Sequence, residues 1–147
     1  MDEKAANELP ECLMCSLVES NGPESGWVFE EEHWLGGVLP GFEVPGWLIV
    51  TVRRHVEGPF NLNDVEAKSL GGMIRRVSGA INDLMAPDRV YQVAMSERWP
   101  HWHFPILARP KWVPPEGRGL AYMDACKDMI DVPEALRIAD ELRTALR

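Results

Sequence analysis

The feature that most limits the fold of this chain is one long helical pattern with strand-like segments on both sides of it in the sequence. Apolar residues recur at helical spacing from Leu70 to Leu84, as they do on the buried face of an amphipathic helix. Asn63 is placed to cap the start, and Glu66, three residues later, completes the pattern of a capping box. We therefore expect a helix that begins near Asn63 and ends before Pro87.

Short apolar and β-branched segments before and after this helix have the composition of strands. They are residues 26–30, 33–39 and 47–52 before it, and residues 90–94 and 102–107 after it. A last helical pattern begins around Pro133 and keeps its apolar residues on one side up to Leu146. This order predicts an α+β fold, in which the long helix and a C-terminal helix cover an antiparallel sheet of about five strands.

Composition and charge exclude several classes of function. Hydrophobic residues make up 46% of the 147 positions and charged residues 26%, the balance of a folded globular protein. The net charge of −8 disfavours a nucleic-acid binder, because such a protein needs a basic face to replace the counterions of phosphates. No apolar run approaches the ~20 residues that cross a bilayer, and the polar start of the chain lacks the parts of a signal peptide. We therefore expect a cytoplasmic protein that makes no contact with membranes or nucleic acid.

The cysteines suggest a metal site. Cys12 and Cys15 form a C-x-x-C pair, whose thiolates can reach one tetrahedral ion from a tight turn. Zinc then needs two more nitrogen or sulfur ligands, and His55 and His101 are available near the ends of predicted strands. A redox pair is the weaker alternative, because no βαβ unit surrounds it. Two small buried thiols without a function are the other alternative.

A second group of candidate residues lies along the extended segment near position 100. Residues two apart in a strand point to the same side, so His101 and His103 project together, with Trp102 and Phe104 on the opposite face. A pair of imidazoles on one face favours a functional site over a packed core. Cys126, far from this motif, is interpreted as an incidental half-buried thiol.

The stretch from Pro100 to Arg109 resembles the signature of the histidine triad superfamily, His-φ-His-φ-His-φ-φ, where φ is an apolar residue. His101 and His103 match its first two histidines. Three upstream segments are also similar to parts of that family: the Cys-x-x-Cys of many bacterial members at 11–15, the strand ending in a basic pair and His at 45–55, and the single long helix at 62–81. The resemblance implies one histidine-triad-like domain over residues 1–147, with its core at 11–110 and a C-terminal extension with a helix at 111–147.

What the resemblance implies for the site is specific. In zinc-containing relatives the positions of Cys12, Cys15, His55 and His101 hold Zn²⁺. The middle histidine of the motif, here His103, attacks an α-phosphate and forms a covalent nucleotidyl-histidine. The implied activity is that of a nucleotide phosphoester or phosphoanhydride hydrolase, similar to diadenosine polyphosphate hydrolases, or of a nucleotidyl transferase.

The resemblance also implies partners. The substrate is a small nucleotide or phosphate ester, and Ser96, Arg98 and His101 are the expected contacts to it. Backbone amides near them can neutralise the phosphate oxygens as charge develops. The family commonly joins two sheets into one, and an exposed edge strand needs covering in any case, so we expect a homodimer.

The sequence departs from the family at the third motif position, which is Pro105 rather than His or Gln. Proline has no side-chain donor and no backbone N–H, so it cannot assist a leaving phosphate. The alternative is therefore a histidine-triad-like protein without hydrolase activity, which binds nucleotides or serves different chemistry. Trp99, Trp102 and Trp112 are expected to add bulk at the mouth of the site.

Overall fold

The computed structural model describes residues 12–147 and contains one five-stranded sheet. All neighbouring strands are antiparallel, in the order β1-β2-β3-β5-β4. The strands are β1 (Trp27–Glu30), β2 (Trp34–Gly37), β3 (Trp47–Val52), β4 (Arg89–Gln92) and β5 (His103–Arg109). The predicted α+β class, with an antiparallel sheet of about five strands, is confirmed.

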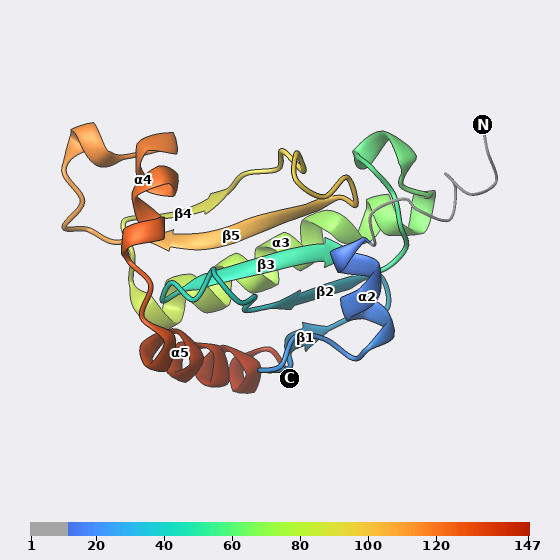
Figure 1. Cartoon of the computed structure of the whole chain (residues 1–147), viewed down its shortest axis with the longest axis horizontal. Coiled ribbons are helices and arrows are strands. Elements are labelled where there is room, and N and C mark those ends of the chain that lie inside the picture. Colours follow the sequence, from blue (N-terminus) through green and yellow to red (C-terminus); the bar gives the residue numbers. More distant parts are fainter. Residues whose placement is uncertain (1–11) are drawn as a thin grey trace.

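Helices cover both faces of the sheet. They are α2 (Leu13–Glu19), α3 (Asp64–Met85), α4 (Leu120–Ala125) and α5 (Val132–Ala145), with short 3₁₀ turns at Pro59–Asn61, Pro115–Gly117 and Cys126–Asp128. Figure 1 shows α3 running behind the sheet, α2 in front of it, and α5 along the edge made by β1. Within residues 12–147, none of these helices has the length and apolar character needed to span a bilayer.

Helix α3 forms as the sequence predicts. The Asn63 side chain accepts a hydrogen bond from the Glu66 N–H at 2.9 Å, and the Glu66 carboxylate accepts one from the Asn63 N–H at 2.9 Å, which is the capping box. The helix buries Met73, Val77 and Ile81 against the sheet. It ends at Met85, and so before Pro87, as predicted.

Strand β3 separates two apolar cores because both its faces are covered. Leu48 and Val50 belong to the core under α3 and α5, whereas Trp47 and Ile49 belong to the core under α2 and α4. A strand buried on both sides reads as a continuous apolar run, as it does here. The face that carries Trp47 and Ile49 is also the face of the candidate site.

Two features differ from the sequence-based expectation. Strand β5 begins at His103, because the Trp102 N–H bonds to the Val56 carbonyl at 2.7 Å instead of joining the ladder with β3. The expected tight turn at Cys12 and Cys15 is instead the start of helix α2, which Cys12 caps. Helix α4 was not predicted; it is six residues long and shows too little periodicity to identify from sequence.

Candidate functional site

Three distant segments bring together the four predicted metal ligands. Cys12 and Cys15 come from the first turn of α2, His55 from the loop after β3, and His101 from the residues just before β5. One potential ligand atom from each lies within 4.8 Å of all the others. The sheet thus holds at one end a cluster whose members are separated by up to 89 positions in the chain.

The distances within this cluster fit a zinc ion. The Nδ1 of His101 lies 3.3 Å from the Sγ of Cys12 and 3.4 Å from that of Cys15, and the Nδ1 of His55 lies 3.4 Å from the Cys15 Sγ. Zn–S and Zn–N bonds of about 2.3 and 2.1 Å in a tetrahedron separate S from N by about 3.6 Å. Two thiolates and two imidazoles are also a usual ligand set of structural zinc.

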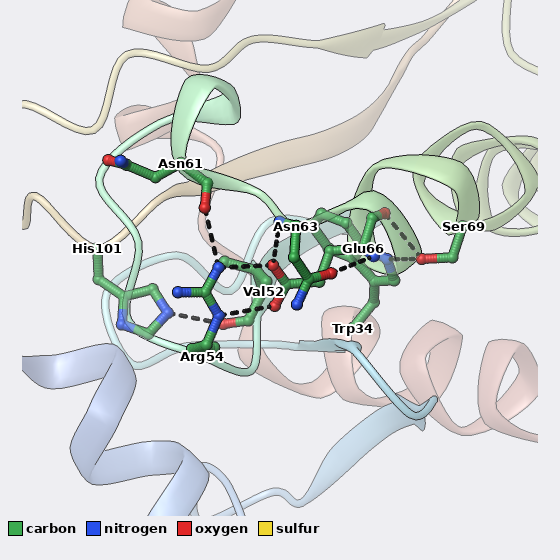
Figure 2. Close-up of polar contacts among 8 residues, drawn as sticks. All are labelled: Trp34, Val52, Arg54, Asn61, Asn63, Glu66, Ser69 and His101. Atoms are coloured by element: carbon green, nitrogen blue, oxygen red, sulfur yellow. Dashed lines mark hydrogen bonds and ion pairs between the residues drawn. The ribbon is translucent and has the colours of Figure 1, made fainter.

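The ring of His101 is oriented by the backbone of β3. Its Nε2 lies 2.6 Å from the Val52 carbonyl oxygen, drawn in Figure 2. A carbonyl can only accept, so Nε2 carries the hydrogen and the lone pair of Nδ1 faces the two sulfur atoms. The side chain is completely buried, and this burial lowers the pKa of His101 although the bond to Val52 opposes the shift. His101 therefore has the neutral form and the tautomer that a metal ligand requires.

The surroundings of the two cysteines bear on the alternative interpretations of the C-x-x-C pair. Burial, with the hydrogen bond and charge of neighbouring Cys12, raises the pKa of Cys15 to about 11. Both side chains are also partly exposed rather than fully buried, which disfavours the alternative of two inert core thiols. A bound cation would stabilise both thiolates.

His103 lies beside the cluster but is held in a different way. Its Nδ1–H donates to the His101 carbonyl oxygen at 2.7 Å, so in the neutral ring the lone pair is on Nε2. The Ser96 hydroxyl donates to the His103 carbonyl at 3.1 Å and accepts from the His103 N–H at 3.2 Å. Ser96 thus fixes the backbone of His103 rather than its ring.

A cavity of about 230 Å³ opens at His103. Its lining is apolar except for His103 and Ser96: Leu39, Phe42, Trp47, Ile49, Val93, Met95, Trp99, Pro105 and Met123. Pro105 shares this wall, directly opposite Ile49 in the sheet. Arg98 lies over the Trp99 ring, 4.8 Å from its centroid, and lines an adjacent cavity of about 470 Å³ rather than this one.

Several expectations about the surroundings need correction. Of the three tryptophans expected at the mouth, Trp99 lines the cavity, whereas Trp102 packs in the core under α3 and Trp112 is exposed near the end of that helix. Cys126 is not half-buried but 1% exposed, in the core under α4. Met123 of α4 was missed as a wall of the cavity, and the sequence holds no motif that would have indicated it.

Comparisons with known proteins concern the fold. No protein-family model and no curated protein matches the sequence. Among solved structures, a histidine triad protein from Bradyrhizobium japonicum is similar with a TM-score of 0.66 and 20% identity, over 82% of this chain and 90% of that one. A zinc-bound histidine triad family protein from Mycobacterium smegmatis is similar with a TM-score of 0.66 and 17% identity, over 92% of this chain and 93% of that one.

Part of a longer enzyme has a similar fold. A uridylyltransferase is similar with a TM-score of 0.68 and 20% identity, over 97% of this chain but 47% of its own length. This chain therefore spans about half of that protein. These likenesses identify the fold of this chain as that of the histidine triad proteins.

Proposed function

We propose that this chain is a zinc-containing nucleotide hydrolase or nucleotidyl transferase that acts on phosphoesters or phosphoanhydrides through a covalent nucleotidyl-histidine at His103. The observation that carries the proposal is the hydrogen bond from His103 Nδ1–H to the His101 carbonyl. It holds the ring with Nε2 as the free nucleophile, at the wall of a cavity. The likeness to a uridylyltransferase supports nucleotidyl transfer.

The reaction then has two steps. In the first, the lone pair of His103 Nε2 forms a bond to the α-phosphorus while the bond from phosphorus to the leaving-group oxygen breaks. In the second, water, or the acceptor of a transferase, attacks the phosphorus while its proton passes to solvent, and the P–N bond electrons return to Nε2. His103 Nδ1–H keeps its bond to the His101 carbonyl and stabilises the positive charge of the substituted ring.

Pro105 limits the leaving group. It lies on the same face of β5 as His103, where it offers neither a side-chain proton nor a backbone N–H. A leaving group that is already stable as an anion, such as phosphate or a nucleotide, needs no proton donor there. We therefore favour phosphoanhydrides over simple alkyl phosphoesters as substrates.

Zinc belongs to the structural part of this proposal. Cys12, Cys15, His55 and His101 would hold one ion with four protein ligands, a set without an open position for substrate. Bound zinc supplies a cross-link between α2, the loop after β3 and the start of β5, and takes no part in the bond changes. The zinc-bound protein of the same fold supports this assignment.

Ser96, Arg98 and His101 are the proposed substrate contacts. Ser96 lines the cavity beside His103, and Arg98 offers a cation at the adjacent cavity. Both ring nitrogens of His101 are engaged, one by the Val52 carbonyl and one by the sulfur cluster. Its contribution to substrate binding would therefore be indirect, through the carbonyl that accepts from His103.

The cavity also favours a second candidate function. Among its described lining residues there is no lysine or arginine, although phosphate charge is usually neutralised by such groups or by backbone amides. Together with Pro105, this apolar lining suits a protein that binds a nucleotide without hydrolysing it, or one that serves different chemistry.

We propose in addition that the chain forms a cytoplasmic homodimer. Strand β4 is an edge of the sheet, with one neighbour, β5, within the described part of the chain. An uncovered edge can pair with the same edge of a second copy. Ultracentrifugation at micromolar concentration should then give twice the 16.6 kDa of one chain, and the mass of a single chain would exclude the dimer.

The test of the proposed activity is direct. The zinc-loaded protein is incubated with dinucleoside polyphosphates, nucleoside phosphoramidates and nucleotide sugars, and mononucleotide products are measured. Quenching in alkaline detergent with an α-³²P-labelled substrate should trap label on the wild-type chain and none on His103→Ala, because a P–N bond to histidine survives alkali but is hydrolysed in acid. Tight nucleotide binding without product or trapped label would instead establish the second candidate.

A further inference from the structure

Near the metal cluster, the half-exposed Arg54 forms an ion pair with the buried carboxylate of Glu66. Glu66 lies in the first turn of α3 with a side chain only 3% exposed. Arg54 donates from Nε to Oε2 at 3.2 Å and from Nη2 to Oε1 at 2.8 Å, and the Asn63 N–H also donates to Oε1 at 2.9 Å. Figure 2 shows the guanidinium facing this carboxylate. The carboxylate is thus held by a capping box and a bidentate arginine at once.

Arg54 lies in the segment that supports both histidines of the cluster. Two residues before it, the Val52 carbonyl orients the ring of His101 at 2.6 Å. One residue after it, His55 faces Cys15 through Nδ1 at 3.4 Å. Arg54 Nη2 also donates to the Asn61 carbonyl at 2.9 Å. The path of the backbone from 52 to 55 is therefore tied to α3 through one side chain.

The helix end that receives Arg54 is itself anchored. The Ser69 hydroxyl donates to the Glu66 carbonyl at 2.9 Å and accepts from the indole N–H of Trp34 at 2.7 Å (Figure 2). Trp34 is fully buried in β2. The start of α3 is thus connected to the sheet as well as to the segment after β3.

We propose that Arg54 and Glu66 are positioning residues of the metal centre. Their ion pair fixes residues 52–55 so that the Val52 carbonyl and the His55 ring are in place before the metal binds. The inference rests on the zinc site of the proposed function and deepens it. Loss of the pair lowers zinc affinity because the free chain must then order this segment on binding, as is usual when groups that orient metal ligands are removed.

The chain contains a matched control pair on the same helix. Arg76 of α3 donates to the Glu31 carboxylate from Nε at 3.0 Å and from Nη2 at 2.7 Å. The Glu31 carbonyl accepts from Arg53 Nη2 at 3.0 Å, but Glu31→Gln changes only the side chain. The variant therefore removes an ion pair of α3 and leaves this backbone contact to the 52–55 segment in place.

The experiment measures zinc affinity by competition with a chromophoric chelator for wild type, Glu66→Gln, Arg54→Lys and Glu31→Gln. Circular dichroism of each metal-free protein first establishes that it is folded. We expect Kd for zinc to rise about 10- to 100-fold in Glu66→Gln, and less in Arg54→Lys, which keeps the charge but loses the bidentate geometry. Glu31→Gln should leave Kd unchanged. The d–d spectrum of the Co²⁺ form should change in Glu66→Gln and not in Glu31→Gln.

The outcomes separate this inference from the one on which it rests. If wild type binds no zinc, the metal centre itself is refuted and the positioning role with it. If wild type binds zinc and folded Glu66→Gln or Arg54→Lys binds it equally tightly with the same Co²⁺ spectrum, the metal centre stands and the positioning role is wrong. An equal loss in Glu31→Gln would likewise overturn it, because the effect would then belong to α3 in general.

Discussion

The metal cluster and the cavity at His103 lie on either side of one short stretch of backbone, and they use their histidines in opposite ways. His101 is completely buried, with one ring nitrogen on the Val52 carbonyl and the other facing two sulfur atoms. His103 is partly buried, with one ring nitrogen on the His101 carbonyl and the other without a described partner. Two histidines two positions apart at the start of β5 therefore acquire different chemistry from the partners of their second nitrogen.

The surroundings of the two regions differ as much as the rings. The cluster is built from α2, the loop after β3 and the start of β5. Polar contacts support it: the Val52 carbonyl bonds to the ring of His101, and Arg54, next to His55 in the chain, bonds to Glu66. The cavity is walled by apolar side chains, one of them Met123 from the C-terminal part of the chain. The first region is suited to hold the fold together and the second to accept a ligand. The two should therefore be separable by mutation.

His103→Asn should give the largest effect. Asn keeps a donor for the His101 carbonyl but has no nucleophilic nitrogen, so turnover should fall by about 10³-fold or more. Zinc content and the unfolding midpoint should stay as in wild type, because the cluster does not include this ring. His33→Asn, just before β2 and outside the cavity, is the control and should keep its turnover. Near-normal turnover of His103→Asn would exclude the covalent mechanism.

Cys12→Ser tests the metal cluster by removing one of its four predicted ligands. At free zinc about 100 times Kd, bound metal stabilises the native state by about 2.7 kcal/mol, and the variant should lack this increment. Metal analysis and urea unfolding with and without zinc measure both quantities. Cys126→Ala, in the core under α4, should keep its zinc even though it loses packing. A wild-type protein that neither holds zinc nor gains stability from it would contradict the assignment.

The fold could be predicted because its determinants are local. The capping pattern of Asn63 and Glu66, the helical period after it and the β-branched run of β3 each specify one element without reference to the others. The C-x-x-C spacing alone indicated a metal site, and His55 and His101 were available as further ligands. The resemblance supplied the full set of four predicted ligands, since 40 or more positions separate these histidines from the cysteines.

The rest depends on tertiary packing that no local pattern records. Glu66 was predicted as a capping residue, but its bidentate partner Arg54 lies 12 positions earlier, across a loop. Met123 reaches the cavity from a helix of six residues. The Trp102 N–H leaves the ladder for the Val56 carbonyl, which sets the start of β5. Each of these follows from how the elements meet in space.

Pro105→His would sharpen the comparison by adding a proton donor to the cavity. Position 105 shares the face of His103, opposite Ile49. The new imidazole should raise hydrolysis of substrates with poor leaving groups by about 10²-fold, the lower end for general acid catalysis. Phosphoanhydrides should gain much less. Pro105→Val restores the backbone N–H without a proton donor, so an equal gain in that variant would assign the effect to the backbone.

Acid unfolding of the metal-free protein should show the smallest effect and reports on the region around the cluster. The hydrogen bonds from Arg54, with the one from the Asn63 N–H and the charge of Arg54, hold the pKa of Glu66 below its usual range although burial opposes the shift. The unfolded chain therefore takes up a proton at higher pH than the native one does. The stabilisation is complete above the unfolded pKa of about 4.3 and is lost as the pH falls toward the native value.

Urea unfolding with chelator present, at pH 7 and at successively lower pH, measures this loss. At pH 7, Glu66→Gln should be less stable than wild type by about 1.5 kcal/mol, the lower range for a hydrogen bond to a charged group because Arg54 is half exposed. The difference should shrink on acidification, since Gln has no proton to take up. Glu134→Gln is the control, because Glu134 pairs with Arg137 on the surface of α5, where solvent screens the pair. A constant difference between wild type and Glu66→Gln at every pH would show that the ion pair does not carry the stability assigned to it, and that packing of the Glu66 side chain does.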